Sequence, residues 1–124
     1  MNSKTEEMLN RTFQFAVDTL KFLNALPPTT VNKVIINQLA KAATSIGANY
    51  EESQAAESRV DFIHKISISS KEARESKYWY RILNELLKEE KQLAQIKVLV
   101  NESEQLSKIF TSIKLTSQEN KKKK

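Results

Sequence analysis

The stretch from Phe62 to Leu87 constrains the fold most, because two apolar stripes run along it at helical spacing. Alternating steps of three and four residues keep each stripe on one face of a helix. The first stripe carries Phe62, Ile66, Ser69, Ala73, Ser76, Tyr80, Leu83 and Leu87. The second stripe carries Ile68, Glu72, Glu75, Trp79, Ile82 and Leu86. The two stripes lie about 100° apart, so we expect this helix to pack against several neighbours, some of them in another subunit.

Three other segments show the same periodicity. A first helix is expected from about Lys4 to Leu26, where Pro27-Pro28 stops it, because proline cannot donate a helical hydrogen bond. A second helix is expected from about Thr30 to Ala56. The apolar positions of the first helix are Leu9, Phe13, Ala16, Leu20 and Leu23, flanked by Met8, Phe15, Phe22 and Leu26. Those of the last helix are Leu93, Ile96, Leu99, Ser103, Leu106, Phe110 and Ile113.

Local signals place the helix ends. Thr29 or Thr30 is a suitable N-cap, and the segment from Ser58 to Asp61 has the form of a capping box. The third helix is expected to reach Glu89 or Glu90, and the fourth to fray after Leu115, where the sequence turns polar.

One glycine and two prolines in 124 residues predict few, long elements. Four helices with short connections favour an all-α, up-down-up-down four-helix bundle. We expect residues 1–117 to form this single domain and residues 118–124 to form a disordered, lysine-rich tail.

Gly47 costs a helix interior about 1 kcal/mol relative to alanine, so we expect it to allow the close approach of a partner helix.

The composition narrows the functional classes. The absence of cysteine excludes disulfides and thiolate metal sites. The acidic N-terminal stretch does not resemble a signal peptide, and no apolar run approaches the ~20 residues of a membrane span. We therefore expect a soluble, cytoplasmic protein without membrane contact. The net charge of +5 comes mainly from the four lysines at positions 121–124, so the body of the chain is nearly neutral.

Two segments carry a family resemblance. Residues 43–52 read A-T-S-I-G-A-N-Y-E-E, which resembles the S-I-x-A-N-x-x-E signature of a bacterial four-helix-bundle family. Asp61-Phe62, K-I-S-I at 65–68 and K-E-A-R-E-S-K-Y-W at 71–79 resemble its second signature. This family is encoded by intervening sequences inside 23S ribosomal RNA genes. It is similar to the accessory variability proteins of diversity-generating retroelements.

The resemblance implies a subunit of a ring-shaped homopentamer with no established enzyme activity. For the retroelement relatives it also implies a basic surface that contacts a reverse transcriptase and nucleic acid. The third helix carries residues suited to such a surface, namely Lys71, Arg74, Lys77, Arg81 and Lys88. These are the candidate RNA or DNA contacts, with Tyr78 as a stacking side chain. The alternative is a solvated face whose cations pair with Glu75, Glu85 and Glu89.

Carboxylates also occur on faces that are otherwise apolar. Glu52, Glu72 and Glu75 are expected to join Ser45 and Asn49 in a structural polar network, because carboxylates entering a core must be paired. A ferritin-like metal site is the alternative, but it needs Glu-x-x-His pairs and the chain has one histidine, His64. No nucleophile motif or phosphate-binding loop is present.

The sequence therefore predicts a non-enzymatic, homo-oligomeric adaptor without metal or cofactor. It is expected to bind RNA or DNA, a protein partner such as a reverse transcriptase, or both. The alternative is a purely protein-binding scaffold that makes no nucleic-acid contact.

Overall fold

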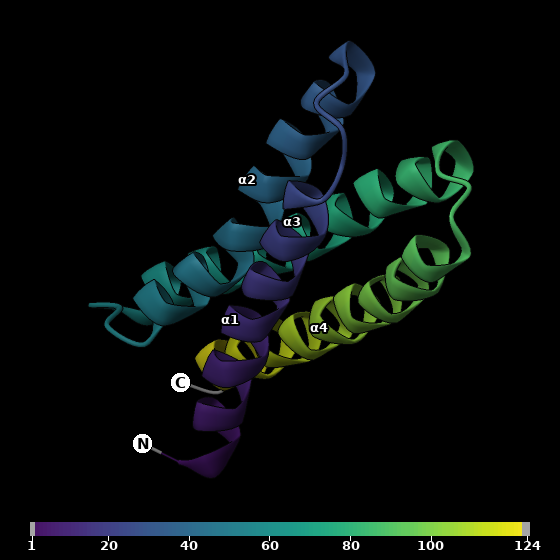
Figure 1. Ribbon diagram of the computed structural model, residues 1–124. Helices are drawn as coiled ribbons and strands as arrows, with labels where there is room; N and C mark the ends of the chain where they lie inside the picture. Colours follow the sequence, from purple (N-terminus) through teal and green to yellow (C-terminus); the bar gives the residue numbers. More distant parts are fainter. Residues whose placement is uncertain (1, 123–124) are drawn as a thin grey trace.

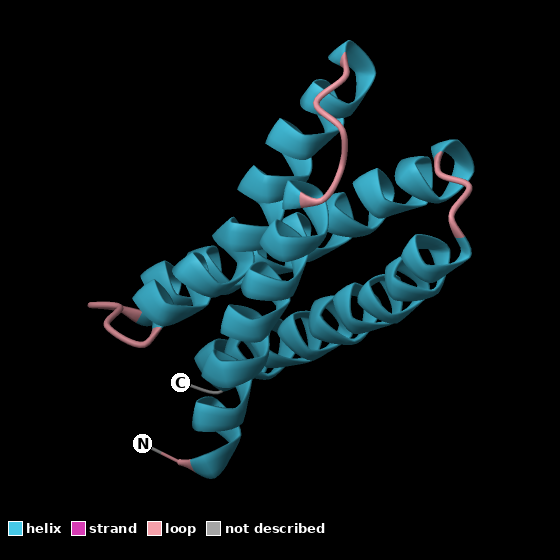
Figure 2. Cartoon of the chain, in the orientation of Figure 1, coloured by secondary structure: helices cyan, strands magenta, loops and turns pink. Residues whose placement is uncertain are grey.

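Four α-helices joined by short connections make up the described chain (Figure 1). The computed structural model describes the backbone of residues 2–122 and the side chains of residues 2–120. The helices are α1 (Ser3–Asn24), α2 (Thr30–Ser53), α3 (Arg59–Leu86) and α4 (Glu90–Lys122). Figure 2 shows only helices and loops, and residues 2–122 contain no strand. The predicted all-α four-helix bundle is confirmed.

The two helical hairpins are not parallel to each other. Figure 1 shows α3 and α4 side by side, whereas the α1–α2 hairpin crosses them at an angle. The α1–α2 and α3–α4 connections consequently point in different directions, which leaves the far end of the α3–α4 hairpin without cover from the other hairpin. A bidentate ion pair joins α1 to α4, with Arg11 donating to the Glu102 carboxylate at 2.6 and 3.0 Å.

Side-chain caps begin three of the helices. The Thr29 hydroxyl accepts a hydrogen bond from the amide of Asn32 at 3.1 Å, and the Ser58 hydroxyl accepts one from Asp61 at 3.0 Å. Both caps were predicted from the sequence. The Asn2 side chain caps α1 in the same way, at 2.8 Å from the amide of Thr5. Each cap satisfies a backbone donor that has no partner inside the helix.

Several predicted helix ends were wrong: α1 stops at Asn24 and α2 at Ser53, two and three residues short of the predicted Leu26 and Ala56. α3 stops at Leu86 rather than at Glu89 or Glu90, because Leu87 takes an extended backbone (ψ 152°) and packs against the core. α4 does not fray after Leu115 but stays helical to Lys122, since its last residues include no glycine or proline to end it. Residues 118–122 of the predicted disordered tail are therefore helical, and Lys123 and Lys124 lie outside the described residues.

Tyr80 of α3 occupies the centre of the bundle. Its side chain is fully buried and its phenol donates to the Thr19 hydroxyl of α1 at 2.6 Å. Its ring meets Phe15 and Phe22 edge-on, with centroids 6.3 and 5.9 Å away. Burial raises the pKa of the Tyr80 phenol, because the ionised form would lose its hydration.

Gly47 lies where α1 and α2 cross. A Cβ atom at this position would lie 3.1 Å from the Thr12 hydroxyl oxygen and 3.4 Å from the Thr12 carbonyl carbon. The predicted close approach of a partner helix is confirmed, and that partner is α1.

Two apolar helix faces remain uncovered. On α1 the flanking positions Met8, Phe15 and Phe22 are buried, whereas two residues of the predicted apolar stripe are exposed, Phe13 by 62% and Leu20 by 42%. On α3 the first predicted stripe forms the core, whereas Trp79 and Ile82 of the second are half-buried and Leu86 is 48% exposed. The wide apolar coverage of the sequence therefore exceeds what one protomer buries.

Candidate nucleic-acid interface

Three of the five predicted cationic contacts lie exposed along α3. Lys71, Arg74 and Arg81 stand three and seven residues apart, so they follow one side of the helix. None of the three lies within ion-pair distance of a described carboxylate. The pairing predicted as the alternative, with Glu75, Glu85 and Glu89, is absent between the described side chains. These three cations are therefore available to an external anion.

Lys77 is placed differently. Its ammonium group lies 3.0 Å from the carboxylate of Glu104 on α4, and both side chains are partly buried. This ion pair ties α3 to α4, so Lys77 contributes less to the free positive charge than the sequence predicted.

Lys88 is not on the helix. Because α3 ends at Leu86, Lys88 lies in the connection to α4, and the seven-residue repeat that aligned it with Arg81 no longer applies. It is exposed near the end of the α3–α4 hairpin. The candidate basic strip thus consists of Lys71, Arg74 and Arg81, and we call these three residues the α3 strip.

Tyr78 stands within the α3 strip. Its side chain is 54% exposed, and it lies four residues after Arg74 and three before Arg81, on the same side of the helix. Its ring rests edge-on against Trp79, with the centroids 5.2 Å apart. An aromatic surface is therefore held in place between cationic side chains.

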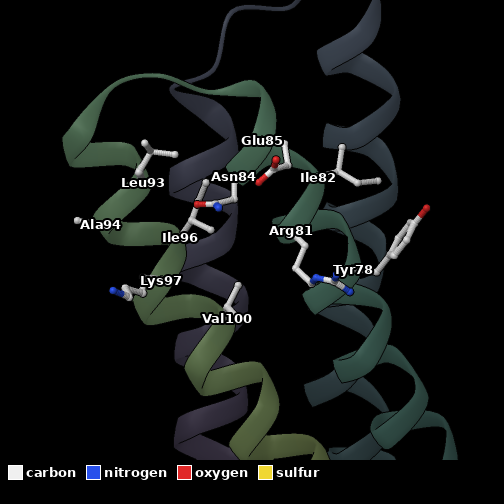
Figure 3. A pocket seen from close by; sticks show the side chains of 10 residues that line it. All are labelled: Tyr78, Arg81, Ile82, Asn84, Glu85, Leu93, Ala94, Ile96, Lys97 and Val100. Carbon is white, nitrogen blue, oxygen red and sulfur yellow. The ribbon is translucent and has the colours of Figure 1, made fainter.

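A surface cavity of about 770 Å³ opens between α3 and α4 beside Tyr78 (Figure 3). Ile82, Leu93, Ile96 and Val100 supply its apolar lining. Arg81 reaches it from α3 and Lys97 from α4. Sequence reasoning missed Lys97, because no sequence pattern shows which flank of α4 faces Arg81. Both cations line the same cavity only because α3 and α4 pack against each other.

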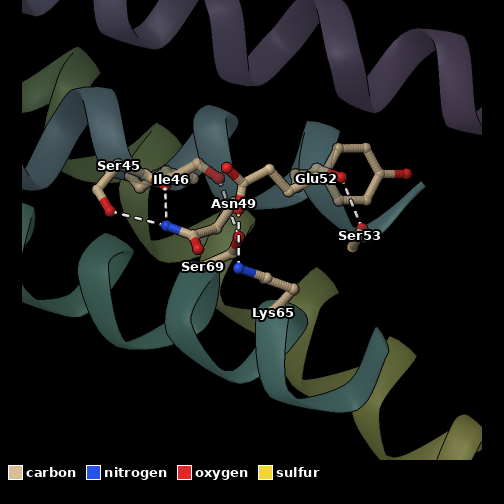
Figure 4. A network of polar contacts seen from close by, with 8 residues as sticks. Ser45, Ile46, Asn49, Glu52, Ser53, Lys65 and Ser69 are labelled. Atoms are coloured by element: carbon tan, nitrogen blue, oxygen red, sulfur yellow. Dashed lines mark hydrogen bonds and ion pairs between the residues drawn. The ribbon is translucent and has the colours of Figure 1, made fainter. Parts of the chain in front are cut away.

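The predicted polar network is present only in part (Figure 4). The Asn49 amide donates to the carbonyl and the hydroxyl oxygens of Ser45, both at 2.9 Å. Glu52 instead pairs with Lys65 of α3 at 2.8 Å. A buried bond from the Ser69 hydroxyl to the Ile46 carbonyl, 2.9 Å long, joins α2 and α3 nearby.

Glu72 and Glu75 lie outside this network. Both are half-buried on α3, and neither carboxylate forms a hydrogen bond or ion pair with another described residue. Burial raises the pKa of Glu72, and the neighbouring Glu75 raises it further against the opposing effect of Lys71 and Lys41. The acids therefore sit on the uncovered α3 face without the predicted partners.

Among the described residues, no three His, Asp or Glu side chains lie close enough together to hold a metal ion. Within the same part of the chain, no helix is both long and apolar enough to cross a membrane.

Comparison with known proteins identifies the family. The family model described as 23S rRNA-intervening sequence protein matches residues 4–112. The chain belongs to this family. A crystal structure of a protein with unknown function from the S23 ribosomal protein family of Bacteroides thetaiotaomicron is similar to it, with 34% identity and a TM-score of 0.72. The match covers 86% of this chain and 97% of that one. The comparison with curated proteins found no match.

In this member of the family the two signature segments face each other. The first lies on α2 and the second on α3, and bonds from Lys65 to Glu52 and from Ser69 to Ile46 join the two helices. The second signature also carries Lys71, Arg74 and Trp79. The second signature segment therefore includes two of the three α3-strip residues and part of the uncovered apolar face.

Proposed function

We propose that this protein is a non-enzymatic, homo-oligomeric adaptor of the cytoplasm that binds nucleic acid through the α3 strip. The observation that carries the proposal is the exposure of Lys71, Arg74 and Arg81 without carboxylate partners along one side of α3. Cations arranged along a helix neutralise backbone phosphates and release counterions, which gives sequence-tolerant binding. Tyr78 adds a face on which an unpaired base can stack.

Assembly into a ring is part of the proposal. The outer face of α1 (Phe13, Leu20) and the outer face of α3 (Trp79, Leu86) are apolar and uncovered in the protomer. Because the two faces belong to different helices, contact between one face and the other is heterologous, and repeated contacts of this kind form a ring when the rotation between neighbours closes. The homopentamer implied by the family resemblance is the expected size. Each subunit of the ring contributes one α3 strip, so the assembly carries several copies of this cationic surface.

The direct test is fluorescence anisotropy of labelled RNA and DNA against the full chain at low and moderate salt. The double variant Arg74→Glu/Arg81→Glu is expected to lose binding. Lys33→Glu/Lys108→Glu is the matched control, since both lysines are exposed but lie on α2 and α4 rather than on α3. A chain that ends at Glu119 separates the contribution of the α3 strip to binding from that of the terminal lysines. Binding that survives the reversal at Arg74 and Arg81, or disappears with the terminal lysines, contradicts the proposal.

A second candidate function is a scaffold that docks a protein, such as a reverse transcriptase, and touches no nucleic acid. The exposed apolar side chains on α1 and α3 favour it, because large exposed apolar patches mark protein contacts. The anisotropy experiment separates the two candidates, since the scaffold predicts no retention of RNA or DNA at any salt concentration.

A further inference from the structure

The cavity at the end of the α3–α4 hairpin combines an apolar interior with a polar rim. Its volume of about 770 Å³ lies within the range of ~300–1,000 Å³ typical of small-molecule sites. Ile96 at its floor is almost fully buried, and Ile82, Leu93 and Val100 are half-buried around it. The divergence of the two hairpins leaves this end of the bundle open (Figure 1).

The rim carries hydrogen-bonding groups that the protein itself does not use. Figure 3 shows Asn84 and Glu85 extending into the space between the two helices. Neither side chain forms a hydrogen bond or ion pair with another described residue. Arg81 lies on the α3 side of this space and Lys97 on the α4 side. Tyr78 adds an exposed aromatic ring at the edge.

These groups match an unpaired nucleotide. A base fills an apolar slot and stacks on an aromatic side chain, while its phosphates need cations outside the slot. Arg81 and Lys97 supply such cations on both sides of the opening. The Glu85 carboxylate can accept a hydrogen bond from the exocyclic amino group of a base. The Asn84 amide can both donate hydrogen bonds to a base edge and accept them from it.

Other occupants fit the rim less well. An acidic peptide would bring a carboxylate close to Glu85, and a purely apolar chain would leave Asn84 and Glu85 without partners. A base that carries an amino group satisfies both side chains. Cytosine, adenine and guanine meet this condition, whereas uracil presents only carbonyl oxygens and a ring N–H and has no amino group for Glu85.

We propose that the α3–α4 cavity binds an unpaired, amino-bearing nucleobase of a single-stranded nucleic acid, with Arg81 and Lys97 holding the flanking phosphates. This inference rests on the proposed nucleic-acid function and adds a base preference to it. The cavity borders the apolar face around Trp79, because Ile82 lines the cavity and follows Trp79 by three residues on α3. Arg81 leaves the helix about 160° from Trp79, so the cation of the cavity rim lies on the other side of α3.

The test compares labelled oligo(C), oligo(U) and a duplex of equal length by anisotropy. The wild-type chain is expected to bind oligo(C) about tenfold more tightly than oligo(U) or the duplex. Val100→Phe, which fills the cavity, is expected to bring oligo(C) to the level of the duplex. Val98→Phe is the matched control, because Val98 lies on the same helix but is exposed outside the cavity. Glu85→Gln is expected to narrow the difference between oligo(C) and oligo(U).

A second readout uses the wild-type chain alone. Cytidine monophosphate is expected to shift the NMR signals of the Asn84 side-chain amide, with the exposed Asn101 amide as the reference. Equal binding of single strand and duplex, or a preference for oligo(C) that persists in Val100→Phe, overturns the cavity proposal and leaves the α3 strip intact. Failure to bind any of the three nucleic acids overturns both proposals.

Discussion

The phenol of Tyr80 donates a hydrogen bond to the Thr19 hydroxyl at 2.6 Å in the fully buried centre of the bundle. The bond connects α3 to α1, two helices that are diagonal in the bundle. A buried polar group that loses its partner pays its full desolvation cost, whereas removal of both groups of a pair is nearly neutral.

The Tyr80–Thr19 pair predicts a strong non-additive effect on stability. Tyr80→Phe is expected to lower the free energy of unfolding by about 1–2 kcal/mol. The double variant Tyr80→Phe/Thr19→Val is expected to be less destabilised than the sum of its two single variants. Urea denaturation of the four proteins measures the coupling. Additive single effects would show that the bond contributes nothing specific.

Gly47→Ala sets helix propensity against packing. Alanine gains about 1 kcal/mol over glycine in a helix, but its Cβ would lie 3.1 Å from the Thr12 hydroxyl oxygen. Thr12 is buried and its hydroxyl also donates to the Met8 carbonyl at 2.9 Å, so it has little room to move. We expect a net loss of about 1 kcal/mol, since overpacking typically costs ~1–3 kcal/mol. Ala48→Gly, at the exposed neighbouring position, measures the propensity effect alone.

Glu72→Gln is expected to cause a small gain in stability at pH 7, and no loss. Burial and the nearby Glu75 raise the pKa of Glu72, so the ionised carboxylate disfavours the folded state. A raised carboxyl pKa contributes stability at low pH that is lost as the pH rises through the folded-state value. The gain of Glu72→Gln should therefore shrink as the pH falls and disappear by about pH 3, where the carboxyl is protonated in both the folded and the unfolded state.

Thermal denaturation of wild type and Glu72→Gln at pH 7 and in acid tests this expectation. A clear loss in Glu72→Gln at pH 7 would mean that the carboxylate is paired, as the sequence-based network predicted.

Phe13→Glu is expected to reduce the assembled mass without unfolding the protomer. Phe13 is 62% exposed on the outer face of α1, so a charge there costs the isolated protomer little but opposes an apolar contact with another copy. Size-exclusion chromatography with light scattering measures the mass. Val98→Glu is the control, because Val98 is a similarly exposed apolar residue on α4. Equal masses for the two variants would argue against α1 as an assembly face.

The α3 strip predicts a defined salt dependence. Three phosphate contacts to single-stranded nucleic acid give a slope of about −2 for the logarithm of affinity against the logarithm of salt concentration. Arg74→Ala should reduce the magnitude of this slope by about 0.7. Lys77→Ala should change it less, because its ammonium group already pairs with Glu104 at 3.0 Å. Equal changes for the two variants would contradict the assignment of Arg74 to the strip.

Much of the fold was predictable because helical periodicity is a local property. The three-four spacing around Ile66, Ala73 and Tyr80 determined that α3 exists and which of its faces forms the core. Thr29 and Ser58 marked helix starts, since capping depends on a few adjacent residues. The end of α3 was not predictable in this way, because Leu87 leaves the helix to pack against a core built from distant segments.

By itself, the sequence determined the helical class, the close approach at Gly47 and the cationic character of α3. Tertiary structure alone decided which charges are free, because ion pairing depends on distances between helices. It joined Lys77 to Glu104 and left Arg74 and Arg81 open to solvent. It also brought Lys97 of α4 to the same cavity as Arg81. Positions within one helix follow from its period, whereas the rotation of one helix against another follows from the packing of the whole core.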